Sequence, residues 1–140
     1  MSRIFWDTNL YIYLFEGHGP LHNRVVALRR AMLERGDQLL TSALTLGEVL
    51  VKPIELQDTV LATKYEEAVT GTSLMISFDA RAAKIYAVLR NDRSLRAPDA
   101  IQLACASSAG VDLFITNDER LSTKHVNGIQ FIAPLSRAPI

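Results

Sequence analysis

The stretch APDAIQLACASSAGVDLFITNDERL, residues 97–121, decides the fold class. Small apolar residues at helical spacing predict a helix over 99–109, and the apolar run that follows predicts a strand over 113–116. A helix followed by a short buried strand is the repeating unit of an α/β sheet. Acidic residues, Asp99 and Asp118, stand at the two ends of this apolar stretch. Because an unpaired buried charge is costly to desolvate, something must neutralise them.

The same alternation runs along the whole chain. Strands are predicted at residues 4–6, 38–41, 74–76, 113–116 and 130–132. Helices are predicted at 10–15, 21–35, 42–51, 56–69, 79–91 and 99–109, with a short helix from about 118. Ser42 is expected to cap the helix over 42–51, and Pro53 to end it. With no repeat or linker, residues 1–140 are predicted to form one α/β domain, a central, mostly parallel sheet of about five strands flanked by helices.

Composition narrows the class of protein. The chain has 140 residues, of which 49% are hydrophobic and 21% charged, as in an ordinary globular domain. Its 15 basic and 15 acidic residues balance, which argues against a protein that binds nucleic acid through overall positive charge. Cys105 is the only cysteine, so it is expected to fill the core of a protein in a reducing compartment. No apolar segment is long enough for a membrane span, and a cytoplasmic location is expected.

Four acidic residues lie where apolar elements meet turns: Asp7, Glu48, Asp99 and Asp118. Asp7 and Asp118 directly follow predicted strands. Open α/β sheets bind ligands beyond the carboxyl ends of their strands, near a topological switch. Glu48 and Asp99 lie early in helices and can point to the same edge, so the sequence predicts one shared acidic site.

Each acid also has an ordinary structural alternative, and for any one residue alone that alternative is favoured. They are a helix cap by Asp7, a capping box of Asp99 with Gln102, a cap by Asp118, and an ion pair of Glu48 with Lys52. However, the convergence of all four acidic residues at one edge of the sheet favours a functional site.

Clustered carboxylates repel one another and ionise together only when a cation neutralises them. A set with oxygen ligands alone suits Mg²⁺ or Mn²⁺ rather than zinc, and the three histidines show no ligand-like spacing. A divalent ion held by carboxylates is suited to phosphate-ester chemistry, because it binds phosphate oxygens and lowers the pKa of a bound water. The residues therefore predict metal-dependent hydrolysis of phosphate esters.

Four segments, in order, resemble the motifs of PIN domains, and particularly the VapC toxin ribonucleases of type II toxin–antitoxin pairs. The segments are FWDTN (5–9), TSALTLGEVL (41–50), APDAIQLA (97–104) and FITND (114–118). The resemblance implies a Rossmann-like α/β/α sandwich and an endoribonuclease that depends on Mg²⁺ or Mn²⁺. It also implies a homodimer and a cognate antitoxin protein that covers the active cleft.

By matching positions, the resemblance assigns Asp7 and Asp99 as the principal metal ligands. Glu48 and Asp118 would complete the catalytic pocket, holding a second ion or orienting the attacking water. The groups that would fix these carboxylates by hydrogen bonds are Thr8, Asn9, Thr116 and Asn117, although a turn role suits Asn117 equally.

Basic residues gather in two segments, 24–35 and 81–96. They could form a basic rim that holds an RNA backbone, or they could be ordinary solvated helix faces. Arg93 and Arg96 are the best RNA-contact candidates, because their loop leads into Asp99.

Three other functions are weighed against a nuclease. A signalling receiver domain would need paired acids after the first strand and a lysine after a late strand, and this chain has Asp7 alone and Thr116 there. A small-substrate phosphatase would need an Asp-x-Asp nucleophile or a glycine-rich phosphate loop. A PIN-like module that binds RNA or protein without cutting remains the main alternative.

Overall fold

Five parallel strands form the central sheet in the order β3-β2-β1-β4-β5. They are β1 (Arg3–Trp6), β2 (Gln38–Ser42), β3 (Leu74–Ile76), β4 (Val111–Thr116) and β5 (Ile129–Pro134). The computed structural model of the chain describes residues 1–139. The predicted α/β class is confirmed, and the sheet is parallel throughout rather than mostly parallel.

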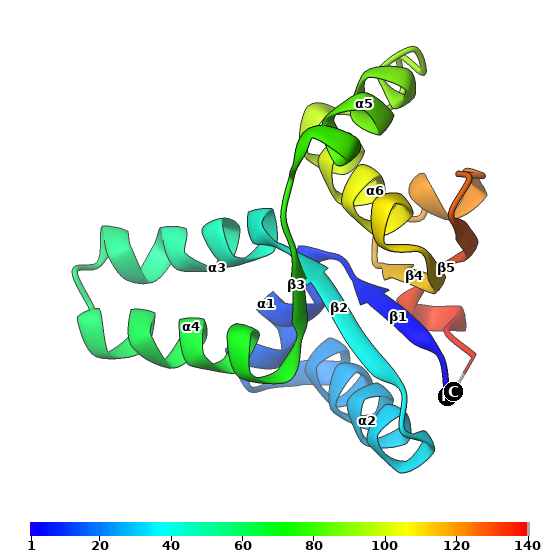
Figure 1. Cartoon of the computed structure of the whole chain (residues 1–140). Helices are drawn as coiled ribbons and strands as arrows, with labels where there is room; N and C mark the ends of the chain where they lie inside the picture. The colour runs from blue at the N-terminus through cyan, green and yellow to red at the C-terminus, as the bar shows by residue number, and fades with distance from the viewer. Residues whose placement is uncertain (140) are drawn as a thin grey trace.

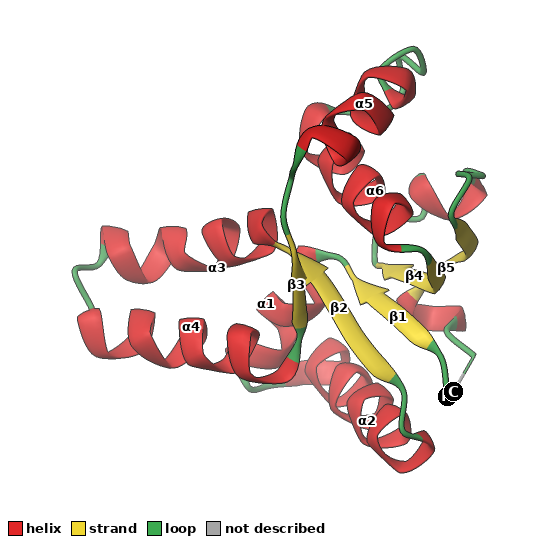
Figure 2. Ribbon diagram, viewed as in Figure 1, coloured by secondary structure: helices red, strands yellow, loops and turns green. Residues whose placement is uncertain are grey.

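Helices cover both faces of the sheet, as Figures 1 and 2 show. The helices are α1 (Thr8–Glu16), α2 (Gly19–Arg35), α3 (Ala43–Glu55), α4 (Thr59–Thr72), α5 (Ala80–Leu89) and α6 (Ala97–Ala109). In Figure 1, α5 and α6 lie on one face of the sheet and α1 and α2 on the other, while α3 and α4 pair beside the β3 edge. No helix in the described part of the chain is long and apolar enough to cross a membrane.

Alternate residues of each strand feed two separate cores, because successive side chains of a strand point to opposite faces. Ile4 and Trp6 of β1 pack with α1 and α2, whereas Phe5 packs with α6 and stacks on Phe114 of β4 at 5.1 Å between ring centroids. Cys105 of α6 is fully buried in the second core, as expected, and burial raises the pKa of its thiol to about 11. Strands buried on both faces explain the continuous apolar runs of the sequence.

The chain reverses its direction of winding between β1 and β4. From β1 it proceeds outward through β2 to β3, then crosses back to place β4 and β5 on the other side of β1. The carboxyl ends of β1 and β4 therefore meet at a topological switch point, with Trp6 in register with Ile115. Ligand sites of open α/β sheets form at such points.

Several predicted boundaries are wrong by a few residues, and two for instructive reasons. α3 continues through Pro53 to Glu55, because a proline removes a single backbone donor and its ring is buried there. α4 begins later than predicted, since Asp58 caps it by accepting from the backbone nitrogen of Leu61 at 3.0 Å. The short helix predicted from about 118 is a 3-10 helix that begins later, Leu121–Thr123.

Candidate functional site

The carboxyl ends of β1 and β4 border a cavity of about 310 Å³, here called the acidic cavity. Asp7 follows β1 directly, Asp118 lies two residues after β4, and Glu48 and Asp99 come from α3 and α6. The residues that line the cavity are Asp7, Thr8, Asn9, Ile12, Glu48, Arg96, Pro98, Asp99, Gln102 and Asp118. The four acidic residues singled out in the sequence thus share one cavity.

Asp7 is the most enclosed of these carboxylates, with 9% of its surface exposed. The backbone nitrogen of Thr8 donates to Oδ1 and the hydroxyl of Thr116 donates to Oδ2, each at 2.8 Å. Burial raises the pKa of Asp7 to about 6, and the charges of Asp99 and Glu48 also raise it, while the two hydrogen bonds lower it. Within residues 1–139, Asp7 forms no ion pair. It is therefore a buried carboxylate whose neighbours leave its charge uncompensated.

Glu48 reaches the cavity from the exposed side of α3 and is linked to the start of α1 through Thr8. The hydroxyl of Thr8 donates to Oε1 of Glu48 at 2.6 Å. Thr8 thus contacts two of the acids, Asp7 through its backbone and Glu48 through its side chain. The ion pair between Glu48 and Lys52, the structural alternative for Glu48, does not form in the described structure.

Asp99 and Asp118 face two arginines. Arg120 Nη2 lies 2.5 Å from Asp118 Oδ2 and 3.7 Å from Asp99 Oδ2, and Arg96 Nε lies 3.3 Å from Asp99 Oδ2. The hydrogen bond from Arg120 holds the pKa of Asp118 below its usual range. Both arginine side chains are more than half exposed, at 67% for Arg96 and 57% for Arg120, so these pairs add little to stability.

The structural alternatives for the acids have mixed outcomes. Asp7 does cap α1, so it fills its structural role and lines the cavity at once. Asp118 Oδ1 accepts from the backbone nitrogen of Arg120 at 3.0 Å and so also stabilises the turn. The capping box of Asp99 with Gln102 is wrong, because Arg96 is the N-cap residue of α6 and Asp99 lies inside its first turn. There its charge still interacts favourably with the helix N-terminus.

The remaining sequence candidates divide by position. Asn9 lines the cavity, and its Oδ1 accepts from the backbone nitrogen of Asn117 at 3.3 Å. The side chain of Asn117 donates to the hydroxyl of Tyr13 at 2.8 Å, a contact that fits its turn role. Arg96 lines the cavity, whereas Arg93 is exposed in the turn before α6 and does not line it.

Two residues at the site, Arg120 and Gln102, were not singled out in the sequence as site residues. Arg120 stands two positions after Asp118, and its charge beside an acidic motif was the available signal. Gln102 is 2% exposed and bonds to Thr8 and Thr45, at 2.9 and 2.8 Å. A glutamine within an apolar helix face is itself a signal, because buried amides need partners.

The donor chemistry of the acidic cavity fits a hard divalent cation, since all four acids supply oxygen and Asp7 lacks a counter-ion. Among residues 1–139, however, no three His, Cys, Asp or Glu side chains are already grouped closely enough to hold one ion. Asp99 and Asp118 are turned toward arginines instead. Ion binding would require these carboxylates to exchange exposed guanidinium groups for the metal.

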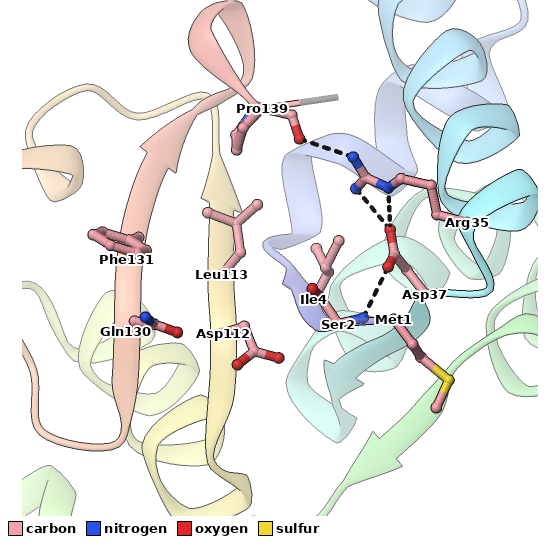
Figure 3. Close-up of a pocket in the computed structure, with 10 residues that line it drawn as sticks. All are labelled: Met1, Ser2, Ile4, Arg35, Asp37, Asp112, Leu113, Gln130, Phe131 and Pro139. Carbon is pink, nitrogen blue, oxygen red and sulfur yellow. Dashed lines mark hydrogen bonds and ion pairs between the residues drawn. The ribbon is translucent and has the colours of Figure 1, made fainter.

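A second cavity, of about 370 Å³, lies at the amino ends of β1, β4 and β5, whereas the acidic cavity lies at the carboxyl ends (Figure 3). There Asp37 accepts from the backbone nitrogen of Ser2 at 2.9 Å and pairs with Arg35 at 2.7 Å, which ties the start of the chain to the end of α2. Arg35 and Asp37 are thus already paired with each other, and Asp112 accepts from the backbone nitrogen of Arg3 at 2.7 Å. The acidic cavity, at the switch point, is the better candidate site.

Solved structures of known proteins share this fold. A solved VapBC2 complex from Rickettsia felis, bound to a promoter DNA fragment, superposes with a TM-score of 0.75 at 12% identity, covering 94% of this chain and 98% of that one. VapBC-1 of nontypeable Haemophilus influenzae gives a TM-score of 0.71 at 17% identity, covering 96% and 99%. VapBC-5 of Mycobacterium tuberculosis gives 0.62 at 20% identity, covering 96% and 99%. These similarities show a shared fold.

Sequence comparison gives the family directly. No curated protein matches the chain. The sequence profile of the PIN domain matches residues 4–126, a span that includes the whole acidic cavity and four of the five strands. The chain belongs to the PIN-domain family.

Proposed function

We propose that the protein is a metal-dependent endoribonuclease that hydrolyses RNA phosphodiester bonds with a water activated by Mg²⁺ or Mn²⁺. We further propose that it is the toxin of a toxin–antitoxin pair. Membership of the PIN-domain family and the fold shared with VapBC complexes support both statements.

The observation that carries the proposal is the state of Asp7. Its carboxylate is buried, has no ion-pair partner in the described structure, and has its pKa raised to about 6. The raised pKa means that the ionised form of Asp7 stabilises the folded protein less than the protonated form does, because desolvating the charge is unfavourable. Strongly perturbed carboxylates in a cavity are typical of functional sites.

The four acids would divide the work by position. Asp7 and Asp99 would hold the ion, and Glu48 and Asp118 would hold a second ion or orient the attacking water. When bound, the divalent ion lowers the pKa of a water molecule and stabilises charge on the phosphate oxygens. Thr116 and Thr8 hold the Asp7 oxygens in place by hydrogen bonds and favour its ionised form.

Arginines at the cavity rim would bind the RNA backbone. Arg96 is exposed and lines the cavity, so its guanidinium can reach a phosphate beside the scissile bond. Arg93 precedes it in the same exposed turn and would extend this contact along the strand.

An antitoxin partner is supported by an apolar groove of about 380 Å³ beside the acidic cavity. The groove is lined by α1, α3 and α4, and it shares Ile12 and Glu48 with the acidic cavity. A protein segment seated on its apolar residues, such as Phe15 and Leu56, would lie next to the catalytic carboxylates.

We also propose a homodimer, which analytical ultracentrifugation of the purified chain tests.

A second candidate function is a PIN module that binds RNA or protein without cutting. The pairing of Asp99 and Asp118 with Arg96 and Arg120 favours it, because these carboxylates are already neutralised in the metal-free protein. Ion dependence separates the two functions: cleavage requires the divalent ion, whereas simple binding does not.

The test is digestion of RNA by the purified protein with and without Mn²⁺, with the cut sites mapped. The proposal predicts cleavage when Mn²⁺ is present and none when it is absent. Asp7→Asn or Asp99→Asn should abolish this cleavage. Glu67→Gln, which changes an exposed acid on α4, should retain it. Cleavage by Asp7→Asn at the wild-type rate would refute the role of Asp7. RNA binding without any cleavage would favour the second candidate.

A further inference from the structure

A buried polar cluster lies behind the acidic cavity, between α6, α3, the end of β2 and the start of α1. Its centre is Gln102, which is 2% exposed. Its other members are Thr8, Thr41, Ser42 and Thr45, all buried. Polar groups at this depth are expensive unless each finds a partner, so the arrangement of donors and acceptors is tightly constrained.

A chain of hydrogen bonds runs in one direction from Ser42 through Gln102 and Thr8 to Glu48. Gln102 Nε2 donates to the hydroxyl oxygens of Thr8 and Thr45, at 2.9 and 2.8 Å, and Ser42 donates to Gln102 Oε1. Since Thr8 Oγ1 accepts from Gln102, its own proton is free to go to Glu48 Oε1 at 2.6 Å. The amide of Gln102 therefore sets the orientation of the hydroxyl that holds Glu48.

The same amide approaches Asp7. Gln102 Nε2 lies 3.4 Å from Asp7 Oδ1, the oxygen that also accepts from the backbone nitrogen of Thr8 at 2.8 Å. One buried side chain thus contacts one acid directly and a second acid through Thr8. Gln102 bonds to Asp7 and also to the Thr8 hydroxyl, which in turn holds Glu48. Among the other residues in the described part of the chain, none bonds to both groups.

Ser42 shows that the cluster takes precedence over local helix stability. It occupies the N-cap position of α3, as the sequence predicts, but its hydroxyl makes no capping bond. Instead the hydroxyl donates to Gln102, which fixes which end of the amide faces Thr8 and Thr45. A serine at this position ordinarily caps the helix, so the contact replaces a stabilising local interaction.

We propose that Gln102 is a positioning residue that holds Thr8, and through it Asp7 and Glu48, in the orientation required to bind a divalent ion. This inference rests on the proposed metal-dependent function. Partners that orient metal ligands commonly change metal affinity or activity by about 10–100-fold when they are removed.

The test replaces Gln102 with methionine, which has a similar length and volume but no N–H donor. The matched control is Leu103→Val, a packing change at the next residue of α6, in the second core and outside the cavity. Three quantities are measured on the folded full chain: the NMR order parameter of the Thr8 methyl group without metal, the Kd for Mn²⁺ by calorimetry, and kcat and KM on RNA. Gln102→Asn, which is too short to reach both threonines, replaces Gln102→Met if that variant does not fold.

For Gln102→Met, the inference predicts a lower Thr8 order parameter, a Kd for Mn²⁺ raised about 10–100-fold, and a lower kcat with little change in KM. The control Leu103→Val should reproduce none of these effects. Combined with Thr8→Val, which removes the intermediate hydroxyl, the Gln102 change should reduce Mn²⁺ affinity by less than it does in the wild-type chain, because only its direct contact with Asp7 is then left to lose. Additive losses, or wild-type Thr8 order with wild-type Mn²⁺ affinity, would overturn the inference.

These readouts separate this inference from the proposed function. If Gln102→Met loosens Thr8 and weakens Mn²⁺ binding while neither protein cuts RNA, then the positioning role stands and the ribonuclease assignment fails. If the wild-type protein binds no Mn²⁺, the metal-dependent function fails and the inference built on it fails too.

Discussion

Thr116, the last residue of β4, donates a hydrogen bond of 2.8 Å to the carboxylate of Asp7, the residue that follows β1. Two strands that are far apart in the sequence thus meet in one contact at the switch point of the sheet. The contact holds a carboxylate where burial raises its pKa to about 6. Most of the predictions below follow from this arrangement.

Replacing Asp7 with asparagine should stabilise the metal-free protein at neutral pH. The folded pKa of about 6 lies above the ordinary 3.8, so the contribution of Asp7 to stability is fully present below about pH 4 and is lost as pH rises through 6. Asparagine carries no charge at any pH. We expect Asp7→Asn to raise the free energy of unfolding by about 1–3 kcal/mol at about pH 8 and by much less near pH 4. Urea denaturation at the two pH values measures it, and equal effects at both would contradict the account.

Affinity for Mn²⁺ should depend on pH through Asp7. A protonated carboxyl cannot bind the cation, so Asp7 must lose its proton, and its pKa of about 6 sets where this happens in the metal-free protein. We expect the association constant to fall about tenfold per pH unit below about pH 6 and to level off above it. Calorimetric titrations across this range test the prediction. A flat profile would show that Asp7 does not bind the ion.

Thr116→Val should raise the pKa of Asp7 further, because the hydroxyl of Thr116 lowers it by donating to the ionised form. The same change leaves the backbone nitrogen of Asp118 without its bond to Thr116 Oγ1, so some loss of stability should accompany it. Carboxyl NMR titration reads the pKa directly. Thr63→Val, an exposed threonine on α4, serves as the matched control and should leave the Asp7 titration unchanged.

Arg120→Ala should raise the pKa of Asp118, since the hydrogen bond from Arg120 is the main reason that this pKa is low. Because Arg120 is exposed, the change should hardly affect the melting temperature. NMR titration of the Asp118 carboxyl measures the shift. Arg90→Ala, whose guanidinium contacts Tyr86 instead, is the control. An unchanged Asp118 pKa would mean that the pair with Arg120 does not persist in solution.

The sequence predicts the strands of this fold better than the ends of its helices. Strand signals such as the run over 113–115 in β4 are apolar segments between breakers, and they follow from burial on both faces of a parallel sheet. Helix ends depend on packing that local rules cannot include. Pro53 was expected to stop α3 but is buried inside it, and α4 runs past Gly71 to Thr72.

The acidic site shows the same division. The carboxylates that gather in the cavity are visible in the sequence because Asp7, Asp99 and Asp118 stand near the ends of apolar elements and Glu48 lies within an apolar helix. The hydrogen bonds that orient them are not visible, because Gln102 lies 94 positions from Thr8 in the chain. Arg120 was missed for another reason: a charge in a turn is ordinarily a solvated side chain.

The central claim is that the carboxylates of the acidic cavity bind a divalent ion, and calorimetric titration of the metal-free protein with Mn²⁺ at about pH 7.5 tests it most directly. The account predicts saturable binding by the wild-type chain and by Glu67→Gln, and no measurable binding by Asp7→Asn. Saturable binding of equal affinity in Asp7→Asn, or no binding in the wild-type chain, would contradict it.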